Sequence, residues 1–288
     1  MRKLYYRWEI IVYNIKQKVG GGNMASFYTH AYFGELVEKQ LPSHIGEIVK
    51  KYPELYYIGL QGPDILFFYR GYYSNKITKI GFGQHKKPGK EFFIPALEIL
   101  RTCRNQEAGL SYLAGFICHF TLDSAVHPYI DTVEKEKGLS HAEIEAETDR
   151  YLMIQENLDY LRYVGADQVV CSSENAEIIS WFWKDISAKE IKVALQYMKR
   201  INRLFCAPGK IKRHIVYGGL RIIGQYNSLK GMIINYNENE LCKENTEHIV
   251  SLCHDAVMDA VALIKEYEAT MTQEGDTLNE RYNLTFGV

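Results

Sequence analysis

Three ionisable side chains recur at intervals of four residues in segment 115–130, namely His119, Asp123 and His127. In a helix, residues at this spacing share one face, within about 80° of arc. The rest of the segment is mostly apolar, and burying three ionisable groups is costly unless something pairs them. A divalent metal ion would do so, because imidazole and carboxylate are ordinary zinc ligands. The alternative is an Asp–His pair buried for structural reasons; we favour the metal.

A second set with the same spacing follows at His141, Glu145 and Asp149. These side chains would also share one helical face. Taken alone, the set is better explained as a solvated face, because acidic residues recur through 143–149. Beside the first set, a second group of metal ligands becomes the better explanation.

Three further candidates lie outside these predicted helices. His30 comes just before a predicted helix, Asp64 lies in the turn GLQGPD, and His85 lies in a glycine-rich stretch. Each is unremarkable alone, since a loop Asp is usually a turn former or a cap. With the two sets they supply five His and three carboxylates, enough for two or three zinc ions with open positions. The eight candidate ligands are His30, Asp64, His85, His119, Asp123, His127, His141 and Glu145.

The elements that must position these side chains are predicted to be helices almost throughout. Apolar residues recur near the 3.6-residue period, and no run of alternating short strands is present. The sequence predicts an all-α protein, with one multi-helix domain over residues 24–288. Helices are expected over 35–52 with a break at Pro42, 92–103, 107–127, 140–163, 175–183, 189–205, 210–226 and 244–270, with a loop over 71–89.

Two local signals predict helix ends near the candidate ligands. Pro128 disfavours helical geometry in the residue before it, so the first ligand helix should end at His127. Ser140 followed by Glu143 matches a capping box, which predicts the start of the next helix.

The composition is that of an ordinary globular protein. The chain has 288 residues, 47% of them hydrophobic, and 34 Lys and Arg residues against 35 Asp and Glu, for a net charge of −1. This balance argues against a dedicated nucleic-acid binder. Segment 189–213 is locally basic and could dock on anionic lipid or nucleic acid, although a solvated helix face is the commoner meaning.

The N-terminal segment 1–23 is ambiguous. Its apolar part is interrupted by Arg7 and Glu9 and no small-residue cleavage site follows, so we reject a signal peptide. No stretch reaches the roughly 18 apolar residues of a membrane span. We therefore expect a cytoplasmic protein, in which 1–23 is either a short amphipathic helix or an extension upstream of a true start at Met24.

The ligand pattern resembles the zinc-dependent phospholipase C family, whose fold is shared with zinc nucleases that prefer single strands. The resemblance covers about 30–149, and the matching pieces are THAYFGELV, GLQGPDILFFYR, HKKPGKEF, AGFICHFTLDSAVHPYI and SHAEIEAETDRYL. It implies an all-α domain with a cluster of three zinc ions. By resemblance, the first zinc would be held by His85, His119, Asp64 and Asp123, the second by His127, His141 and Glu145, and the third by His30 with Asp123 as a bridge. Asp64 is also the candidate general base.

This sequence departs from the well-studied secreted members in three ways. They place the last His of the helix motif six residues after the Asp, whereas His127 comes four after Asp123. They use a free N-terminal amino group as a ligand, which here would require a start at Met24 and exposure of Ala25. The choline-preferring enzymes follow the loop Asp with Tyr, whereas Ile65 stands here, so headgroup preference cannot be inherited.

The resemblance predicts zinc-dependent hydrolysis of a phosphodiester, most directly phospholipase C action on a phospholipid by a metal-activated water. Contact with a membrane surface would accompany such a substrate. Two alternatives stay open: a zinc nuclease or nucleotide phosphatase on the same scaffold, and a zinc-stabilised binding protein without catalysis. The near-neutral charge weighs against a nucleic-acid substrate.

Overall fold

The computed structural model describes residues 26–71, 74–272, 275 and 277–287. Segment 1–23 and its possible helix, as well as Met24 and Ala25, lie outside the described residues. Within those ranges the chain is helical and contains no β-strand, so the prediction of an all-α fold is confirmed. Among these residues, no helix has both the length and the apolar character needed to cross a bilayer.

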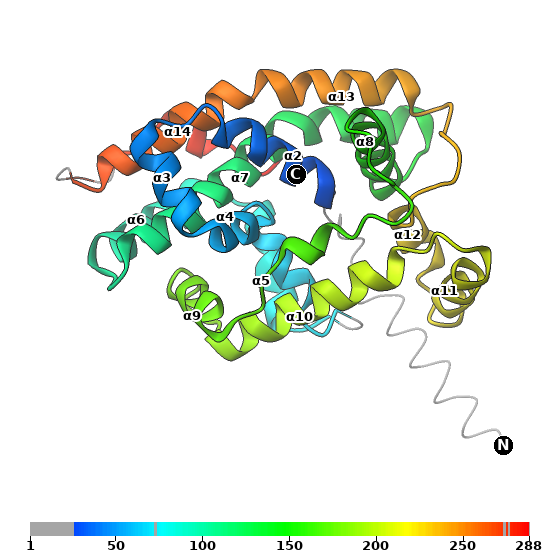
Figure 1. Ribbon diagram of the computed structural model, residues 1–288, viewed down its shortest axis with the longest axis horizontal. Helices are drawn as coiled ribbons and strands as arrows, with labels where there is room; N and C mark the ends of the chain where they lie inside the picture. Colours follow the sequence, from blue (N-terminus) through cyan, green and yellow to red (C-terminus); the bar gives the residue numbers. More distant parts are fainter. Residues whose placement is uncertain (1–25, 72–73, 273–274, 276, 288) are drawn as a thin grey trace.

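The long helix α7 (Gln106–Lys137) runs through the middle of the molecule (Figure 1). Its segment 108–123 is buried without interruption. Around it pack α2 (Phe27–Glu38), α4 (Pro53–Gly59), α13 (Lys243–Asp255) and α14 (Val257–Thr270). A helix that is apolar on all sides needs such complete cover, and this explains why α7 shows no single polar face.

Helices α4 and α7 cross at two glycines. A Cβ atom on Gly115 would overlap the carbonyl oxygen of Tyr56, and one on Gly59 would overlap the carbonyl oxygen of Tyr112. The hydroxyl of Tyr56 donates to the carbonyl of Gly34 at 2.8 Å, which ties α4 to α2. The crossing therefore brings three elements that carry candidate ligands, or lead into them, to one place.

The remaining elements complete the cover. The α-helices are α3 (Ser43–Lys51), α5 (Lys76–His85), α6 (Lys90–Thr102), α8 (His141–Gln155), α9 (Ser173–Trp181), α10 (Ala188–Phe205), α11 (Lys210–Ile222) and α12 (Tyr226–Leu229). The 3-10 helices are η1 (Gly62–Phe68), η2 (Gly165–Gln168), η3 (Lys230–Met232) and η4 (Glu280–Asn283). One large buried apolar cluster contains side chains from most of these elements; its first member in the sequence is Phe27 and its last is Phe286.

The prediction that the first ligand helix ends at His127 is wrong. Helix α7 continues through Pro128 to Lys137 and ends at Gly138, whose φ is 66°. Beyond the proline, Ile130 and Val133 remain buried on the helix. Their burial offsets the hydrogen bond that a proline removes from a helix interior.

The prediction of a loop over 71–89 is also wrong, because helix α5 occupies most of it. The side chain of Asn75 accepts from the backbone N–H groups of Ile77 and Thr78, at 3.0 and 3.1 Å, and the Thr78 hydroxyl accepts from the backbone N–H of Asn75 at 2.9 Å. This capping box satisfies the N–H groups that the first helical turn leaves free. A Cβ on Gly81 would lie 2.9 Å from the Cβ of Leu66, so glycine here permits close packing on η1.

Helix α8 begins after Ser140 as predicted, but it lacks the predicted capping box and ends earlier than expected. Ser140 is its N-cap residue but makes no capping hydrogen bond, and Glu143 accepts instead from the side-chain amide of Asn239 at 3.0 Å. The helix ends at Gln155 rather than near Tyr163, with Asn157 at a φ of 58° just beyond it. The helix expected over 244–270 is divided at Ala256 into α13 and α14.

Candidate metal centre

The structure brings all eight predicted ligands together in the interior. Each is at most 7% exposed. They come from five elements: His30 from α2, Asp64 from η1, His85 from the end of α5, three residues from α7, and His141 and Glu145 from α8. His30 lies within the first turns of α2 rather than before a helix, which corrects its predicted placement.

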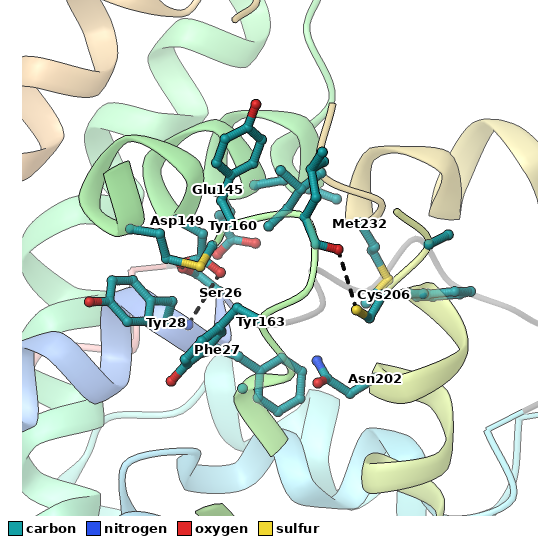
Figure 2. A pocket seen from close by; sticks show the side chains of 18 of the residues that line it. Ser26, Phe27, Tyr28, Glu145, Asp149, Tyr160, Tyr163, Asn202, Cys206 and Met232 are labelled. Carbon is teal, nitrogen blue, oxygen red and sulfur yellow. Dashed lines mark hydrogen bonds between the residues drawn. The ribbon is translucent and has the colours of Figure 1, made fainter. Parts of the chain in front are cut away.

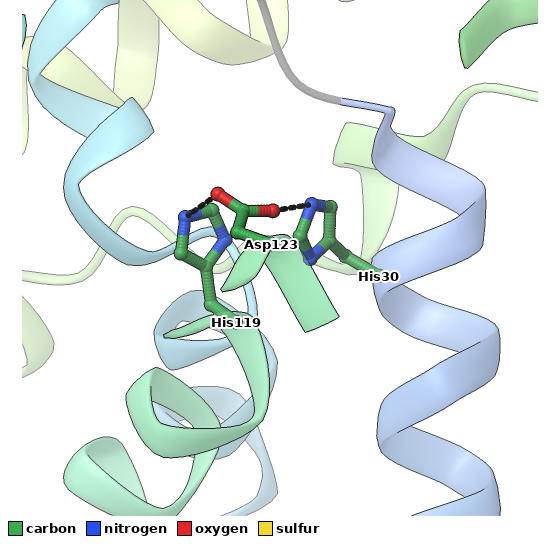
Figure 3. Close-up of side chains that lie close together, drawn as sticks. All are labelled: His30, His119 and Asp123. Carbon is green, nitrogen blue, oxygen red and sulfur yellow. Dashed lines mark ion pairs between the residues drawn. The ribbon is translucent and has the colours of Figure 1, made fainter. Parts of the chain in front are cut away.

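Asp123 lies at the middle of this arrangement. Its Oδ2 is 3.1 Å from Nε2 of His119, and its Oδ1 is 3.3 Å from Nε2 of His30, so the carboxylate stands between the two imidazoles (Figure 3). Nε2 of His127 is 3.5 Å from Oδ1, and Nε2 of His85 is 3.9 Å from Oδ2. One carboxylate thus faces four imidazoles from three helices, which is a geometry suited to bridging.

Potential ligand atoms within 4.8 Å of one another form three buried groups. They are His30, His119 and Asp123; Asp64, His85 and His119; and His127, His141 and Glu145. The group Asp64, His85 and His119 matches the ligands that the resemblance implies for the first zinc ion, except that Asp123 is not in it. The group His127, His141 and Glu145 is the full set that the resemblance implies for the second zinc ion. A fourth group adds Asp131 and Glu134 on the other side of the His141 ring, where both carboxylates are partly exposed.

Backbone carbonyls orient three of the imidazoles. Nδ1 of His85 lies 3.0 Å from the carbonyl oxygen of Gly81, that of His119 lies 3.2 Å from Leu60, and that of His127 lies 2.9 Å from Phe286. An Nδ1–H that donates outward leaves Nε2 as the lone-pair nitrogen, the arrangement usual in metal-binding histidines.

Two glycines make room for these imidazoles. At Gly62, where φ is 48°, a Cβ would overlap the ring of His119. At Gly287, where φ is 84°, a Cβ would lie 2.5 Å from the Cβ of His127. Both positions combine a left-handed backbone with close approach, which glycine tolerates. Sequence reasoning missed Phe286 and Gly287, because no motif links residues so distant from the ligand helices.

The donor atoms suit a divalent cation better than they suit one another. Among the described residues, buried atoms without a hydrogen-bond partner include His119 Nε2, Asp64 Oδ1, Asp123 Oδ1, His141 Nε2 and Glu145 Oε2. Without a cation, these atoms face one another only as Asp–His or Glu–His ion pairs, such as Asp64 Oδ1 with Nε2 of His85 at 2.9 Å. Five such atoms in one place, all of types that bind zinc, fit a site built for metal rather than a self-sufficient Asp–His pair.

The electrostatics keep the carboxylates of Asp123 and Glu145 ionised. Burial works to raise the pKa of Asp123, but the neighbouring His119 and His127 hold it well below its usual range. Burial likewise opposes ionisation of Glu145, yet His141 and His127 lower its pKa to about 2. Burial works to lower the pKa of His127, but Asp123 and Glu145 raise it to about 9. His127 would therefore release a proton on binding a metal ion.

Asp149 does not join the ligands, which corrects the expectation from its spacing. Its carboxylate accepts from the backbone N–H groups of Thr29 at 2.8 Å and Tyr28 at 3.2 Å, from the Thr29 hydroxyl at 2.7 Å, and from the Ser26 hydroxyl. An acceptor at this position satisfies the free N–H groups of the first turn of α2. Asp149 thus connects α8 to the helix that carries His30.

A pocket adjoins the ligand cluster (Figure 2). It has an empty volume of about 700 Å³, its open mouth included, and Glu145 and Asp149 lie on its polar wall. Its labelled apolar lining in Figure 2 includes Phe27, Tyr160 and Met232. Because Glu145 belongs both to the pocket and to a candidate ligand group, a molecule in the pocket would lie beside the metal centre.

An all-α fold with buried groups of His and carboxylate ligands on five elements defines a helical metalloprotein. A family model described as zinc dependent phospholipase C matches residues 29–199, which is more than half of the chain and includes all eight candidate ligands. The chain therefore belongs to the zinc-dependent phospholipase C family, whose general activity is hydrolysis of the phospholipase C type with zinc as the metal. Neither the curated proteins nor the solved structures gave a match.

Proposed function

We propose that this protein is a phospholipase C that cleaves a glycerophospholipid at two or three zinc ions held by the eight candidate ligands. The observation that carries the proposal is the Asp123 carboxylate among four imidazoles, with Asp64 and Glu145 in the flanking groups. Zinc held there would neutralise phosphate charge and lower the pKa of a bound water towards neutrality.

Asp64 is the proposed general base. Its Oδ1 lies 2.9 Å from Nε2 of His85, and the side chain is buried within the ligand cluster. The carboxylate can therefore orient the attacking water and accept its proton. Water oxygen bonds to phosphorus, the bond between phosphorus and the glycerol oxygen breaks, and a proton passes to that oxygen. The products are diacylglycerol and a phosphorylated headgroup.

The pocket beside Glu145 suits the apolar part of such a substrate. Phe27, Met153, Phe205 and Met232 contribute apolar walls, while Glu145 and Asp149 make one polar side. A phospholipid has the same division between a charged phosphate and an apolar glyceride. Pockets that bind amphipathic ligands commonly combine apolar walls with a few placed polar groups.

The test is turnover by the zinc-loaded protein on three substrates: mixed micelles of phosphatidylcholine, single-stranded DNA, and a chromogenic phosphodiester. We expect diacylglycerol from the phospholipid, and no phosphatidic acid. Faster cleavage of DNA than of phospholipid would favour the nuclease alternative instead. Full zinc occupancy without turnover on any phosphodiester would favour the non-catalytic zinc-binding alternative and would overturn the proposal.

A further inference from the structure

Helix α11 exposes an unusual number of large apolar side chains. Ile211, Ile215 and Ile222 are 80%, 70% and 80% exposed. Their spacings of four and seven residues place them within about 40° of arc on one face. The opposite face is already used, because Val216 and Leu220 are buried in a small apolar cluster. Exposed apolar residues that line up on one face usually mark an interaction site.

The charge around this stripe is of one sign. Residues 191–237 contain nine Lys and Arg residues and no Asp or Glu. The remainder of the chain carries 25 basic residues against 35 acidic ones. On α11, His214, Lys210 and Arg221 are exposed along one flank of the isoleucines. A helix with an apolar face bordered by basic side chains is typical of proteins that lie in the interface of an anionic membrane.

Helix α11 also reaches the pocket, through Arg213 on the face opposite the stripe. Arg213 lines the pocket from α11 and donates to the carbonyls of Ala207 and Ile234, at 3.2 and 2.7 Å. Figure 1 places α11 at the edge of the molecule beside α12, and the pocket wall near α11 includes Met232 and Phe205. A surface that covers the outer face of α11 would therefore be separated from the pocket by the thickness of this one helix.

We propose that α11 docks on an anionic phospholipid surface, with Ile211, Ile215 and Ile222 in the acyl boundary and the flanking basic residues at the lipid phosphates. The proposal deepens the proposed function, and rests on it, because docking would hold the protein at the phospholipid surface that contains the proposed substrate. Two copies of the same basic face would repel each other, which disfavours a symmetric dimer through α11. Isoleucines with this exposure also distinguish the face from a purely electrostatic nucleic-acid surface.

The experiment compares the full-length, zinc-loaded protein with Ile211→Glu/Ile215→Glu in sedimentation with phosphatidylcholine vesicles, with and without phosphatidylserine. We expect the double variant to lose about tenfold or more in partition coefficient. Met258→Glu is the matched control, since Met258 is 61% exposed on α14, and it should bind as the wild type does. Lys210→Ala/Arg221→Ala should weaken binding chiefly to the vesicles that contain phosphatidylserine, and salt should do the same.

Several outcomes would overturn the docking proposal. The first is equal vesicle binding by the double variant and the wild type. The second is a wild-type dimer that becomes monomeric in the double variant. The third is a protein that binds single-stranded DNA and does not bind vesicles. Hydrolysis of a short-chain monomeric phospholipid by the wild type is scored separately. Turnover without vesicle binding refutes docking alone, whereas stripe-dependent binding without turnover refutes the proposed function alone. Circular dichroism verifies that each variant is folded.

Discussion

The carboxylate of Asp123 faces four imidazoles. Substitution by Asn removes its negative charge and keeps the size and shape of the side chain. Asp123→Asn should abolish measurable turnover, with a loss of at least about 100-fold, and should lower the zinc content per chain. A neutral amide cannot bridge two cations. Elemental analysis and a phospholipid assay provide the two readouts.

The matched control for this substitution is Asp259→Asn. Asp259 pairs with Arg281 at 2.6 Å on the surface and is 40% exposed at its side chain. Surface ion pairs contribute little, so zinc content and turnover should be unchanged. Wild-type turnover in Asp123→Asn would instead mean that the group His119, Asp123 and His127 is structural.

The raised pKa of His127 predicts that zinc binding releases a proton. The imidazole must be neutral to bind a metal ion, and at pH 7.5 a group with a pKa of about 9 is mostly protonated. Calorimetric titration of the metal-free protein with zinc, in buffers of different ionisation enthalpy, should show release of about one proton attributable to His127. His127→Asn should remove that proton, and release should fade above about pH 9 in the wild type. Equal release by both proteins would contradict the assignment.

The same pKa shifts determine how the metal-free fold responds to pH. Protonated His127 stabilises the fold fully below its ordinary pKa of 6.5, and this contribution is lost as the pH rises through about 9. Ionised Glu145 stabilises the fold above its ordinary pKa of 4.5, and this contribution is lost as the pH falls through about 2. From these two groups, the metal-free protein is expected to be most stable between pH 4.5 and 6.5.

At the scale of the elements, periodicity predicted what depends on local sequence. The spacing of His119, Asp123 and His127 on an apolar segment predicted a buried helix there, and α7 places the three side chains among the other candidate ligands. Helix α5 was missed because glycines at 81 and 83 suggest a loop, while its Asn75 capping box and its packing on η1 depend on three-dimensional context. The end of the helix at Pro128 was predicted wrongly because the burial of Ile130 and Val133, which stabilises the helix beyond the proline, depends on the tertiary structure and not on the local sequence.

Helix α2 offers a test of how one element positions a ligand. Asp149→Ala would leave two backbone N–H groups and two hydroxyls at the start of α2 without their acceptor. We expect the free energy of unfolding to fall by about 2–4 kcal/mol and zinc stoichiometry to fall as His30 loses its fixed place. Urea denaturation and elemental analysis are the measurements.

Asp149→Asn is the conservative comparison. The amide keeps an acceptor oxygen in the same place, so it should lose less stability than the alanine variant and retain more zinc. If both variants keep wild-type stability and zinc content, the cap does not position His30.

At the scale of the whole molecule, residues near the end of the chain contact the ligands. The carbonyl of Phe286 lies 2.9 Å from Nδ1 of His127, and its N–H donates to the carbonyl of His85 at 3.3 Å. Phe286 itself is fully buried against Phe120 and Phe116. No sequence rule links residue 286 to a histidine near position 127, because the contact exists only once the whole chain is folded.

Removing residues 284–288 should therefore weaken the site without touching a ligand. Loss of a group that orients a metal-bound histidine commonly costs about 10–100-fold in metal affinity, and we expect that range here, together with a lower Tm. Competition with a zinc chelator and thermal unfolding measure the two effects. The control is Leu284→Ser, whose side chain is 49% exposed and whose backbone contact with Gly89 remains. Unchanged zinc affinity after truncation would show that the Phe286 carbonyl is dispensable.

The glycine crossing of α4 and α7 also fixes a length. Only four residues separate Gly59 from Asp64, and Gly62 between them is pressed against the ring of His119. A displacement at the crossing would therefore pass almost undiminished to the carboxylate of Asp64. The distance between the donor atoms on η1 and those on α7 is consequently determined by how closely the main chains of α4 and α7 approach each other. Exchanging one ligand side chain for another would change the chemistry of the site but would leave this backbone spacing unchanged.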